Sequence, residues 1–476
     1  MALGRYSSLS VIPLGNLLLF LSCTLPSARY TDTRMSTQII RPARSLQGSL
    51  TVPGDKSISH RYAMLAGLAE GTSRLTNFST GADPHSSLAC MEALGAIVHR
   101  NPDNSIQITG VAGTFRQPSA PLDCGNSGST MRMLSGLIAS HPHTFTLIGD
   151  PSLTLRPMER IRNPLVQMGA NIDLTRLEGD QQGHAPITIH GGPLHAIDFA
   201  TPIPSAQVKT AVLFAGLQAE SVTSLSESIL TRDHTEQALL AFGASFTRSH
   251  NPNGPARLSI PGGQRLRAID ATVPGDISSA AFFLCAALLF PDSNLVLDSL
   301  GMNPTRAALL DVIAALGGRI KVLAVEEHHG ELIGTIQVNL DPAKRTTSPL
   351  IINSPLTAQL IDELPVLAAI APHTTNGLII RDAQELRVKE SDRIALVAKN
   401  LLAMGAQFTE HHDGLEIPGN QSLHGATIDS GGDHRIAMAF AIAALRATGD
   451  SEILGAESAS ISFPEFFTAL DSLALR

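Results

Sequence analysis

Hydrophobic and polar positions follow a recurring order along the chain. A run with the apolar spacing of an amphipathic helix ends near a glycine, and a β-branched or alternating run typical of a strand comes next. This order occurs five times, in MEALGAIV (91–98), LVQMGANID (165–173), LLAFGASF (239–246), VIAALGGRI (312–320) and LLAMGAQF (401–408). Glycine readily adopts the left-handed backbone conformation that terminates a helix. The pattern therefore predicts a chain built from repeated α/β units.

The spacing of these glycines indicates a true internal repeat. The first four are 74 residues apart and the fifth follows after 88 residues, at Gly95, Gly169, Gly243, Gly317 and Gly405. A further apolar helix, Phe463 to Leu473, ends about where a sixth copy should end. The alternative is that helix, glycine and strand simply recur often in α/β proteins, but equal intervals argue against this. Six such units account for nearly the whole chain.

A second internal similarity predicts two halves. The sequence TVPGD occurs at 51–55 and again at 272–276, each time before a helix start with serine in its first turn. We expect two domains of three units each, one formed by residues 54–273 and the other by 35–53 plus 274–476. A hinge is expected near residues 53 and 274. We also expect the helices to pack inside each domain and the sheets to lie outside.

The composition excludes several classes of protein. Hydrophobic residues make up 43% of the 476 residues and charged residues 16%, so the chain is globular rather than disordered. Thirty-four basic and 42 acidic residues give a net charge of −8, which argues against nucleic acid as a partner. Tryptophan is absent and there are three tyrosines, which argues against a surface that stacks bases.

Cysteine usage and hydropathy indicate a compartment. The four cysteines, at positions 23, 90, 124 and 285, form no C-x-x-C pair. This argues against a zinc site or a redox pair and fits a reducing compartment. After the first 34 residues, no run reaches the ~18–20 uninterrupted apolar residues that a membrane span needs. We therefore expect a cytoplasmic protein that has no membrane partner.

Residues 1–34 differ from the rest of the chain. They carry Arg5, then an apolar run from Leu17 to Leu21 and small residues up to Ala28, an order that resembles a signal peptide. A proline, a glycine and an asparagine at positions 13, 15 and 16 interrupt the apolar stretch, and Met35 follows directly. We expect an upstream extension or a misassigned start before Met35. A transit peptide and a secretion signal are the alternatives.

Several helix starts carry groups that bind anions. Backbone N–H groups at a helix N-terminus attract negative charge, and lysine, arginine or serine in the first turns adds donors. Segments of this kind are GDKSISHR (54–61), DCGNSGSTMR (123–132), LRPM (155–158), PSAQVK (204–209) and TRDH (231–234). None contains the P-loop sequence G-x-x-x-x-G-K-[ST], so nucleotide hydrolysis is not implied. Each segment by itself also fits an ordinary capped helix or a solvated loop.

Two further segments supply candidate acids and bases. Six of the nine residues of ELRVKESDR (385–393) are charged, and Lys389 and Arg393 are expected on one face of a helix beside Glu390. A carboxylate among cations is a candidate proton-transfer group, although such a run is also typical of a solvated helix start. IDELP (361–365) places two acids in an apolar run, where a buried carboxylate is a candidate general base.

The segment GDHR (432–435) begins another apolar helix with a cation. No second ligand stands at helical spacing from its histidine, so it does not support a metal site. The cationic helix starts come from both halves of the chain. Together they predict a cleft between two domains that binds anionic substrates.

The same segments resemble the EPSP synthase family, the 3-phosphoshikimate 1-carboxyvinyltransferases. The motifs that carry the resemblance occur in the family's order: GDKSISHR, GNSGSTMR, LRPM, SAQVK, RDHTE, VPGD, IDELPVLA, ELRVKESDR, GDHRIAMA and SFPEF. The resemblance runs from about residue 40 to the C-terminus, and residues 1–34 lie outside it.

This resemblance implies a fold and an activity. The fold is a two-domain, enolpyruvyl transferase-like α/β architecture with six βαβαββ-type repeats, three in each inside-out, barrel-like domain. The activity transfers the enolpyruvyl group of phosphoenolpyruvate to the 5-hydroxyl of shikimate 3-phosphate by addition and elimination, with release of phosphate. This step lies on the shikimate pathway to chorismate and the aromatic amino acids. The resemblance implies no metal and no organic cofactor, and we expect a monomer.

The resemblance also implies which residues form the site. Asp362 resembles the base that takes the proton of the attacking hydroxyl, and Glu390 resembles the acid that protonates the methylene carbon. Lys56 is the third residue with a catalytic role. Residues that resemble ligands of shikimate 3-phosphate are Lys56, Ser57, Arg61, Ser205, Ala206, Gln207, Arg232, Asp362 and Lys389. Those that resemble ligands of phosphoenolpyruvate are Lys56, Gly128, Arg156, Gln207, Arg393 and Arg435.

A few positions bear on ligand binding within this family. Arg232 stands where many members have serine, and it still offers donors to a phosphate. Met133 replaces a proline, and Ser462 precedes Phe463 where some members have a lysine, so one cation is absent. Gly128 leaves open the space that an alanine methyl fills in glyphosate-tolerant relatives. We therefore expect glyphosate to inhibit in competition with phosphoenolpyruvate.

Three other functions are alternatives. Enolpyruvyl transferases acting on UDP-N-acetylglucosamine use Lys-Asn at the first motif and usually a reactive cysteine on a mobile loop. This chain has Lys56-Ser57 and no cysteine between Cys124 and Cys285. RNA-terminal phosphate cyclases have a related architecture, but their nucleotide-linked histidine chemistry has no motif here. A catalytically inactive anion-binding protein is the third alternative, and the retention of both Asp362 and Glu390 argues against it.

Overall fold

The computed structural model describes residues 36–476, apart from residues 181, 250–255, 342 and 344–347. All elements below belong to the unit formed by residues 35–476. The expected extension at 1–34 lies outside the described residues. Among the described helices, none combines the length and the apolar character needed to cross a lipid bilayer.

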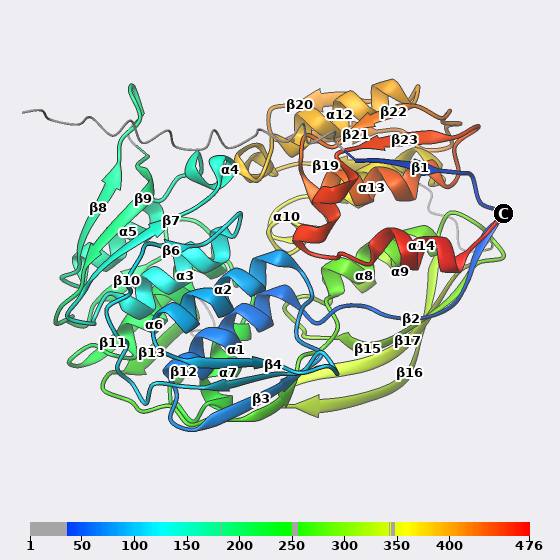
Figure 1. The fold of residues 1–476 in the computed structure, drawn as a ribbon. Helices are drawn as coiled ribbons and strands as arrows, with labels where there is room; N and C mark the ends of the chain where they lie inside the picture. The colour runs from blue at the N-terminus through cyan, green and yellow to red at the C-terminus, as the bar shows by residue number, and fades with distance from the viewer. Residues whose placement is uncertain (1–35, 181, 250–255, 342, 344–347) are drawn as a thin grey trace, which may run out of the picture. The chain divides into compact units, whose positions relative to one another are not determined.

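Six small sheets are present among the described residues (Figure 1). Three are formed by residues 72–272, the first half. The strand order of the first is β14 (Asp270–Thr272), β3 (Thr72–Thr76), β5 (Ile106–Thr109) and β4 (Ile97–Arg100), and that of the second is β6 (Leu122–Asp123), β7 (Thr144–Ile148), β9 (His184–His190) and β8 (Asn171–Thr175). The third has the order β10 (Asp198–Ala200), β11 (Val222–Glu227), β13 (Ala256–Pro261) and β12 (Thr247–Ser249).

The other three sheets form the second half. The strand order of the first is β16 (Gly318–His328), β17 (Glu331–Leu340), β15 (Asn294–Gly301), β2 (Ser45–Thr51) and β24 (Ala474–Leu475). The second has the order β18 (Leu350–Ile352), β19 (Leu378–Ile380), β21 (Gly414–Ile417) and β20 (Thr409–His411), and the third has the order β1 (Thr37–Ile40), β23 (Ser451–Leu454) and β22 (Thr427–Asp429). Each of the six sheets has one parallel strand pair, and its other pairs are antiparallel. The sixfold repeat expected from the sequence is therefore confirmed.

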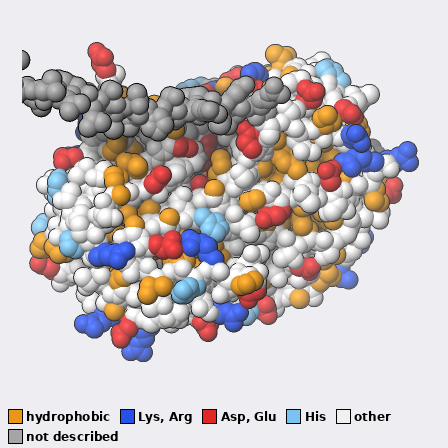
Figure 2. All heavy atoms as spheres, viewed as in Figure 1, with side chains coloured by type: hydrophobic (Ala, Val, Ile, Leu, Met, Phe, Trp, Pro, Cys, Tyr) orange, Lys and Arg blue, Asp and Glu red, His pale blue; other side chains and the backbone are white. Residues whose placement is uncertain are grey.

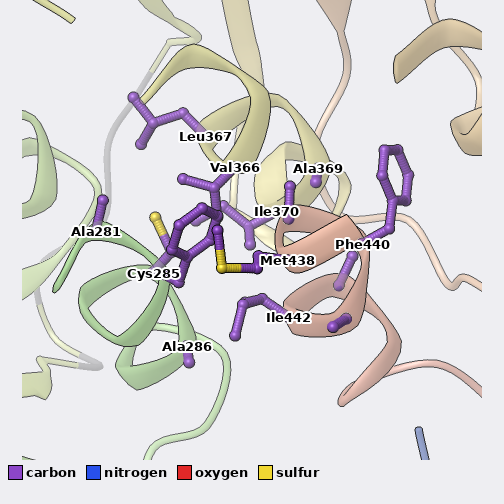
Figure 3. Close-up of a cluster of buried hydrophobic side chains, with 14 of the residues drawn as sticks. Ala281, Cys285, Ala286, Val366, Leu367, Ala369, Ile370, Met438, Phe440 and Ile442 are labelled. Carbon is purple, nitrogen blue, oxygen red and sulfur yellow. The ribbon is translucent and has the colours of Figure 1, made fainter. Parts of the chain in front are cut away.

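Helices fill the interior of each half, as the sequence predicts. The inner helices are α1 (Lys56–Leu68), α3 (Gly128–Ile138), α6 (Ala206–Gly216), α8 (Ile277–Ala287), α11 (Leu364–Ile370) and α13 (His434–Ala444). Every residue of α8 and α13 is buried, so these helices contact the protein interior on all sides rather than along one stripe. Figure 3 shows side chains of α8, α11 and α13, among them Cys285, Ile370 and Met438, meeting in one core.

The remaining helices are more peripheral and in part exposed. They are α2 (Ala82–Ala93), α4 (Pro151–Thr154), α5 (Glu159–Gln167), α7 (His234–Ala241), α9 (Ala308–Ala315), α10 (Leu356–Gln359), α12 (Arg393–Ala403) and α14 (Phe466–Leu473), with 3-10 helices η1 (Ala371–His373), η2 (Gln384–Val388) and η3 (Ala456–Ile461). The five repeat glycines follow α2, α5, α7, α9 and α12, and their φ angles lie between +81° and +114°. This confirms the helix ends expected from the sequence.

The two TVPGD segments cross between the halves. β2 comes directly before α1 of the first half in the chain, but it pairs with β15 of the second half. Conversely, β14 comes directly before α8 of the second half, but it pairs with β3 of the first half. At the crossing, the N–H of Asp55 donates to the oxygen of Pro274 at 2.7 Å, and that of Asp276 donates to the oxygen of Pro53 at 2.8 Å. A side chain at Gly54 would place its Cβ 1.8 Å from the carbonyl oxygen of Asn77, so this close approach requires glycine.

Buried hydrophobic side chains form two clusters, one drawn from residues 58–273 and the other from 40–52 and 277–473. Each half therefore buries its own apolar side chains around its own inner helices.

One helix assignment from the sequence is wrong. Lys389 and Glu390 do not share a helical face with Arg393, because η2 ends at Val388 and α12 begins at Arg393. The backbone of Lys389 is non-helical, and the side chain of Asp392 caps α12 by accepting from the N–H of Ala395 at 3.0 Å. An aspartate that caps the free N–H groups at a helix start favours the beginning of a new helix at that point. The cap at Asp392 therefore separates α12 from η2.

Candidate functional site

A cavity of about 540 Å³ lies between the first and second halves of the described unit. Every site residue selected from the sequence lines it: Lys56, Ser57, Arg61, Gly128, Arg156, Ser205, Ala206, Gln207, Arg232, Asp362, Lys389, Glu390, Arg393 and Arg435. These residues are separated by up to 379 positions in the chain, and folding brings them around one space. Residues from both halves of the chain therefore line a single cavity.

Positive charge is concentrated in this cavity. Among the described lining residues, ten are lysine or arginine and six are aspartate or glutamate. The chain as a whole carries a net charge of −8. On the face shown in Figure 2, basic and acidic side chains are interspersed. A walled cavity with a local excess of cations attracts anionic ligands.

Five helices begin at residues that line the cavity. α1, α3, α6, α12 and α13 start at Lys56, Gly128, Ala206, Arg393 and His434. Each start is capped by a side-chain oxygen of the preceding residue, from Asp55, Ser127, Ser205, Asp392 and Asp433. Caps occupy one N–H group each, and the remaining N–H groups and the helix dipoles favour negative charge at the same place.

Asp362 lies among several cations in the cavity. Its Oδ2 accepts from Arg232 Nη2 at 2.6 Å, and its Oδ1 lies 3.6 Å from Arg393 Nη1 and 3.8 Å from Lys389 Nζ. Burial by itself would raise the pKa of Asp362, but Lys389, Arg232 and the other nearby arginines outweigh it and hold that pKa well below its usual value. Asp362 is therefore ionised in the ligand-free site and can accept a proton.

Glu390 is held by arginines from both halves. Its Oε2 accepts from Arg393 Nη2 at 2.6 Å, and its Oε1 lies 3.6 Å from Arg156 Nη1. Burial would raise the pKa of Glu390, but Arg393 and Arg156 outweigh it and hold that pKa well below its usual value. Arg393, which is 1% exposed, contacts both Glu390 and Asp362, so one guanidinium lies between the two carboxylates. Asp433 fixes it by accepting from its Nε at 2.8 Å.

Three arginines of the cavity have no carboxylate within 4 Å among the residues that the structure describes: Arg61, Arg132 and Arg435. Arg61 instead donates to the hydroxyls of Thr235 and Thr210 at 2.7 and 2.8 Å. Burial lowers the pKa of Arg61 to about 10 and that of Arg132 to about 9, so both remain charged at neutral pH. A buried cation without a counter-ion is costly unless an anionic ligand supplies the opposite charge.

Gln207 is oriented by contacts on both sides of its amide. Its Oε1 accepts from Arg132 Nη1 at 2.8 Å, and its Nε2 donates to Ser129 Oγ at 2.9 Å. On the same side of the cavity, Arg156 Nη2 donates to Asn126 Oδ1 at 2.7 Å. These bonds hold polar groups from three segments in fixed directions around Gly128.

Lys56 lies at the start of α1, on the first-half side of the cavity. Its Nζ donates to Asp83 Oδ2 at 3.0 Å. The neighbouring Ser57, Ser205 and Ala206 also line the cavity.

Some lining residues were not selected as site residues from the sequence, namely Arg132, Arg160, Arg306 and His434. Arg132 and His434 stand inside the motifs GNSGSTMR and GDHRIAMA, which are the signal in the sequence that points to them. Both ring nitrogens of His434 are buried without a partner among the described residues. Burial, with Lys56 and Arg435 nearby, holds the pKa of His434 well below its usual value, so its ring is neutral at neutral pH.

No group of three or more His, Cys, Asp or Glu side chains in the described part of the chain is arranged to hold a metal ion. Cys90, Cys124 and Cys285 are buried and free.

Comparison with known proteins gives consistent matches. A model of the EPSP synthase (3-phosphoshikimate 1-carboxyvinyltransferase) family matches residues 40–470. The chain is 58% identical to the 3-phosphoshikimate 1-carboxyvinyltransferase of Koribacter versatilis, over 93% of this chain and 100% of the relative. It is 50% identical to the enzyme of the same name from Solibacter usitatus, over 91% of this chain and 99% of the relative.

Solved structures also match. An EPSP synthase structure from Acinetobacter baumannii superimposes with a TM-score of 0.79 at 37% identity, covering 92% of this chain and 98% of that one. The enolpyruvyl transferase NikO from Streptomyces tendae matches with a TM-score of 0.73 at 17% identity, covering 92% and 98% of the two chains, which shows a shared fold.

Proposed function

Because the chain belongs to the EPSP synthase family, we propose that its cavity binds shikimate 3-phosphate and phosphoenolpyruvate next to each other. The activity of the chain is that of a 3-phosphoshikimate 1-carboxyvinyltransferase, a step of the shikimate pathway. The observation that carries the proposal for the site is the cavity itself, where the residues quoted for the family's two substrates surround one space with an excess of cations.

Shikimate 3-phosphate is assigned to one part of the cavity. Its phosphate would be bound by Arg61, Arg232 and the hydroxyls of Ser57 and Ser205. Arginine suits a phosphate because its planar N–H donors match two phosphate oxygens. The backbone at Ala206 and the side chains of Gln207, Lys56, Lys389 and Asp362 would complete the contacts of this substrate.

Phosphoenolpyruvate is assigned to the part of the cavity around Gly128. Its phosphate and carboxylate would be bound by the cations and the amide grouped there: Lys56, Arg156, Gln207, Arg393 and Arg435. Attack on its C2 gives a tetrahedral adduct that retains both anionic groups. Fixed cations that are already in place stabilise this charge without reorganisation.

Two proton transfers complete the reaction. Asp362 takes the proton of the 5-hydroxyl as its oxygen bonds to C2 of phosphoenolpyruvate, and Glu390 gives a proton to C3, which becomes a methyl group. In the elimination step the bond from C2 to the phosphate oxygen breaks, and Glu390 takes a proton back from C3. The product is an enol ether, and the hydroxyl proton leaves with phosphate. One acid and one base therefore act at different atoms of the same adduct.

The bound substrates prepare Glu390 for its first role. In the ligand-free site, its pKa lies well below the usual value because of Arg393 and Arg156. Phosphate and carboxylate groups of the substrates would offset those cations, which raises the pKa of Glu390 toward the range in which a carboxylic acid donates a proton. Glu390 would thus be protonated in the ternary complex.

The domain boundaries given by the sequence complete the proposal. We propose a hinge near residues 53 and 274, about which residues 54–273 close onto residues 35–53 plus 274–476 when both substrates are bound. Closure would exclude water from the adduct. We further propose that the enzyme acts as a monomer in the cytoplasm. Light scattering of the purified protein tests whether it is a monomer, since a dimer would double the measured mass.

Phosphate release from phosphoenolpyruvate tests the function. The protein is given shikimate 3-phosphate in one reaction and UDP-N-acetylglucosamine in a parallel one. We expect release only with shikimate 3-phosphate. Release with the nucleotide sugar would establish the other enolpyruvyl transfer, and no release in either reaction from folded protein would support an inactive anion-binding homologue.

Glyphosate is expected to inhibit this reaction in competition with phosphoenolpyruvate. Gly128→Ala is expected to weaken the binding of both phosphoenolpyruvate and glyphosate. A Cβ at position 128 would lie 2.9 Å from Arg132 Nη1 and 3.5 Å from Arg156 Nη1. It would displace the guanidinium that orients Gln207, so the KM for phosphoenolpyruvate should rise roughly threefold to tenfold and the inhibition constant of glyphosate should rise further. Inhibition kinetics of the two proteins check this. Wild-type activity unchanged in millimolar glyphosate would contradict it.

A further inference from the structure

The mechanism leaves one buried charged cluster unused. Lys209 lies on α6, four residues after the capping residue Ser205, and its side chain is 1% exposed. Its Nζ donates to Glu227 Oε2 at 3.0 Å and to Glu236 Oε1 at 2.9 Å. Both carboxylates are buried as well. Lys209, Glu227 and Glu236 all lie outside the lining of the cavity.

This cluster holds the segment that connects β11 with α7. Glu227 is the last residue of β11, and Glu236 lies in the first turn of α7. Between them, Thr231 is held twice. Its hydroxyl donates to Glu227 Oε1 at 2.5 Å, and its carbonyl oxygen accepts from Lys209 Nζ at 3.4 Å. Lys209 therefore joins the strand, the connecting segment and the helix at one point.

Arg232 follows Thr231 directly and lines the cavity. Its Nη2 lies 2.6 Å from Asp362 Oδ2, in the opposite half. Binding of an anion by a guanidinium depends on the direction of its planar donors, so a shift of about 1 Å in the backbone of Arg232 would weaken that binding. A group that fixes the residue before Arg232 bears directly on this geometry.

We propose that Lys209 is a positioning residue for the phosphate of shikimate 3-phosphate and that it acts through Thr231 and Arg232. The inference rests on the proposed function, because it takes Arg232 as a ligand of that phosphate. Lys209 touches no substrate. It neutralises two buried carboxylates and fixes the backbone from which Arg232 projects. A buried ion pair adds little stability compared with apolar side chains of similar size, so the burial of Lys209 is not by itself evidence of a stabilising role.

Arg248 offers a matched control. Its Nη2 lies 3.4 Å from Glu236 Oε1 and 3.8 Å from Asp233 Oδ2, and its side chain is 41% exposed. Arg248 therefore adds a cation to the same cluster from the exposed side. Lys209, by contrast, is buried and donates to the carbonyl oxygen of Thr231.

Steady-state kinetics of Lys209→Met test the proposal. We expect the KM for shikimate 3-phosphate to rise at least about tenfold, while kcat and the KM for phosphoenolpyruvate change less than about threefold. Arg248→Met should leave the KM for shikimate 3-phosphate within about twofold of the wild-type value. Glu227→Gln keeps the side-chain volume and should raise that KM severalfold, so it serves if Lys209→Met does not fold. Lys209→Arg, which restores the cation, should recover part of the loss.

The same substitution in an Arg232→Ala background separates positioning from a general loss of structure. If Lys209 acts through Arg232, Lys209→Met should add less than about twofold to the KM of Arg232→Ala. Equal rises in both KM values, an equal effect of Arg248→Met, or full additivity with Arg232→Ala would overturn the inference. If the wild-type protein is active and Lys209→Met has an unchanged KM for shikimate 3-phosphate, the role of Lys209 is overturned and the proposed function stands. If the wild-type protein is inactive, the role of Lys209 and the proposed function are both overturned.

Discussion

Replacing Asp362 by alanine should lower kcat at least about 100-fold while the protein remains folded. The proposed reaction needs a base at the 5-hydroxyl, and Asp362 is kept ionised by Lys389 and Arg232. Its loss also releases Arg232 from the 2.6 Å contact, so that arginine stays available to the substrate phosphate. The effect should therefore appear in kcat more than in the KM for shikimate 3-phosphate. Steady-state kinetics, with circular dichroism to verify folding, measure it.

Asp382 provides the control for this experiment. It lines the same cavity, and its carboxylate accepts from the N–H of Ser354 at 3.0 Å. Its φ angle is +59°, a conformation that asparagine tolerates well, so Asp382→Asn is the suitable replacement. Its kcat should stay within about threefold of the wild-type value. A near-normal kcat for Asp362→Ala would remove Asp362 from its role as base.

Replacing Glu390 by alanine should also lower kcat at least about 100-fold, for a different chemical reason. Glu390 would supply the proton to C3 and then take one back, so both halves of the reaction depend on it. Arg393 and Arg156 hold its carboxylate from two sides, which would fix the position from which the proposed proton transfer occurs. Rapid-quench measurement of a single turnover should show slow formation of the adduct as well as slow release of phosphate.

The matched control for Glu390 is Glu385, five residues earlier in the same charged segment. Glu385 also lines the cavity, where its Oε1 accepts from Arg160 Nη1 at 2.9 Å. Glu385→Gln removes a carboxylate that has no assigned proton-transfer role, so its kcat should change less than about fivefold. If Glu385→Gln and Glu390→Ala lowered kcat equally, the loss would reflect the charge of the segment rather than proton transfer by Glu390.

Much of the fold follows from local signals in the sequence. Helix ends depend on glycine conformation and helix starts on side-chain caps, and both are properties of a few neighbouring residues. The helix ends at the repeat glycines could therefore be predicted from the chain, whereas the caps at Asp55, Ser127 and Ser205 are assigned from the structure. The sequence does not predict the break between η2 and α12, because charge spacing alone does not reveal that Asp392 caps a new helix.

The site itself depends on contacts that spacing does not encode. Arg232 and Asp362 are 130 positions apart, yet they form the 2.6 Å contact between the two halves. Lys209 likewise reads as one more cation at a helix start, and its burial between two carboxylates appears only in the folded structure. Motif resemblance selected the candidate ligand residues individually, whereas the network that orients them is a property of tertiary packing.

The most direct test of the account is to run the reaction in deuterium oxide and examine the product by mass spectrometry. Addition followed by elimination passes through a methyl group at C3, so deuterium from the solvent should enter the vinyl methylene of the product as phosphate is released. Glu390→Ala should form this labelled product at least about 100-fold more slowly, because protonation of C3 is then slow. Product that forms at the full rate without any deuterium would contradict protonation at C3 and, with it, the role assigned to Glu390.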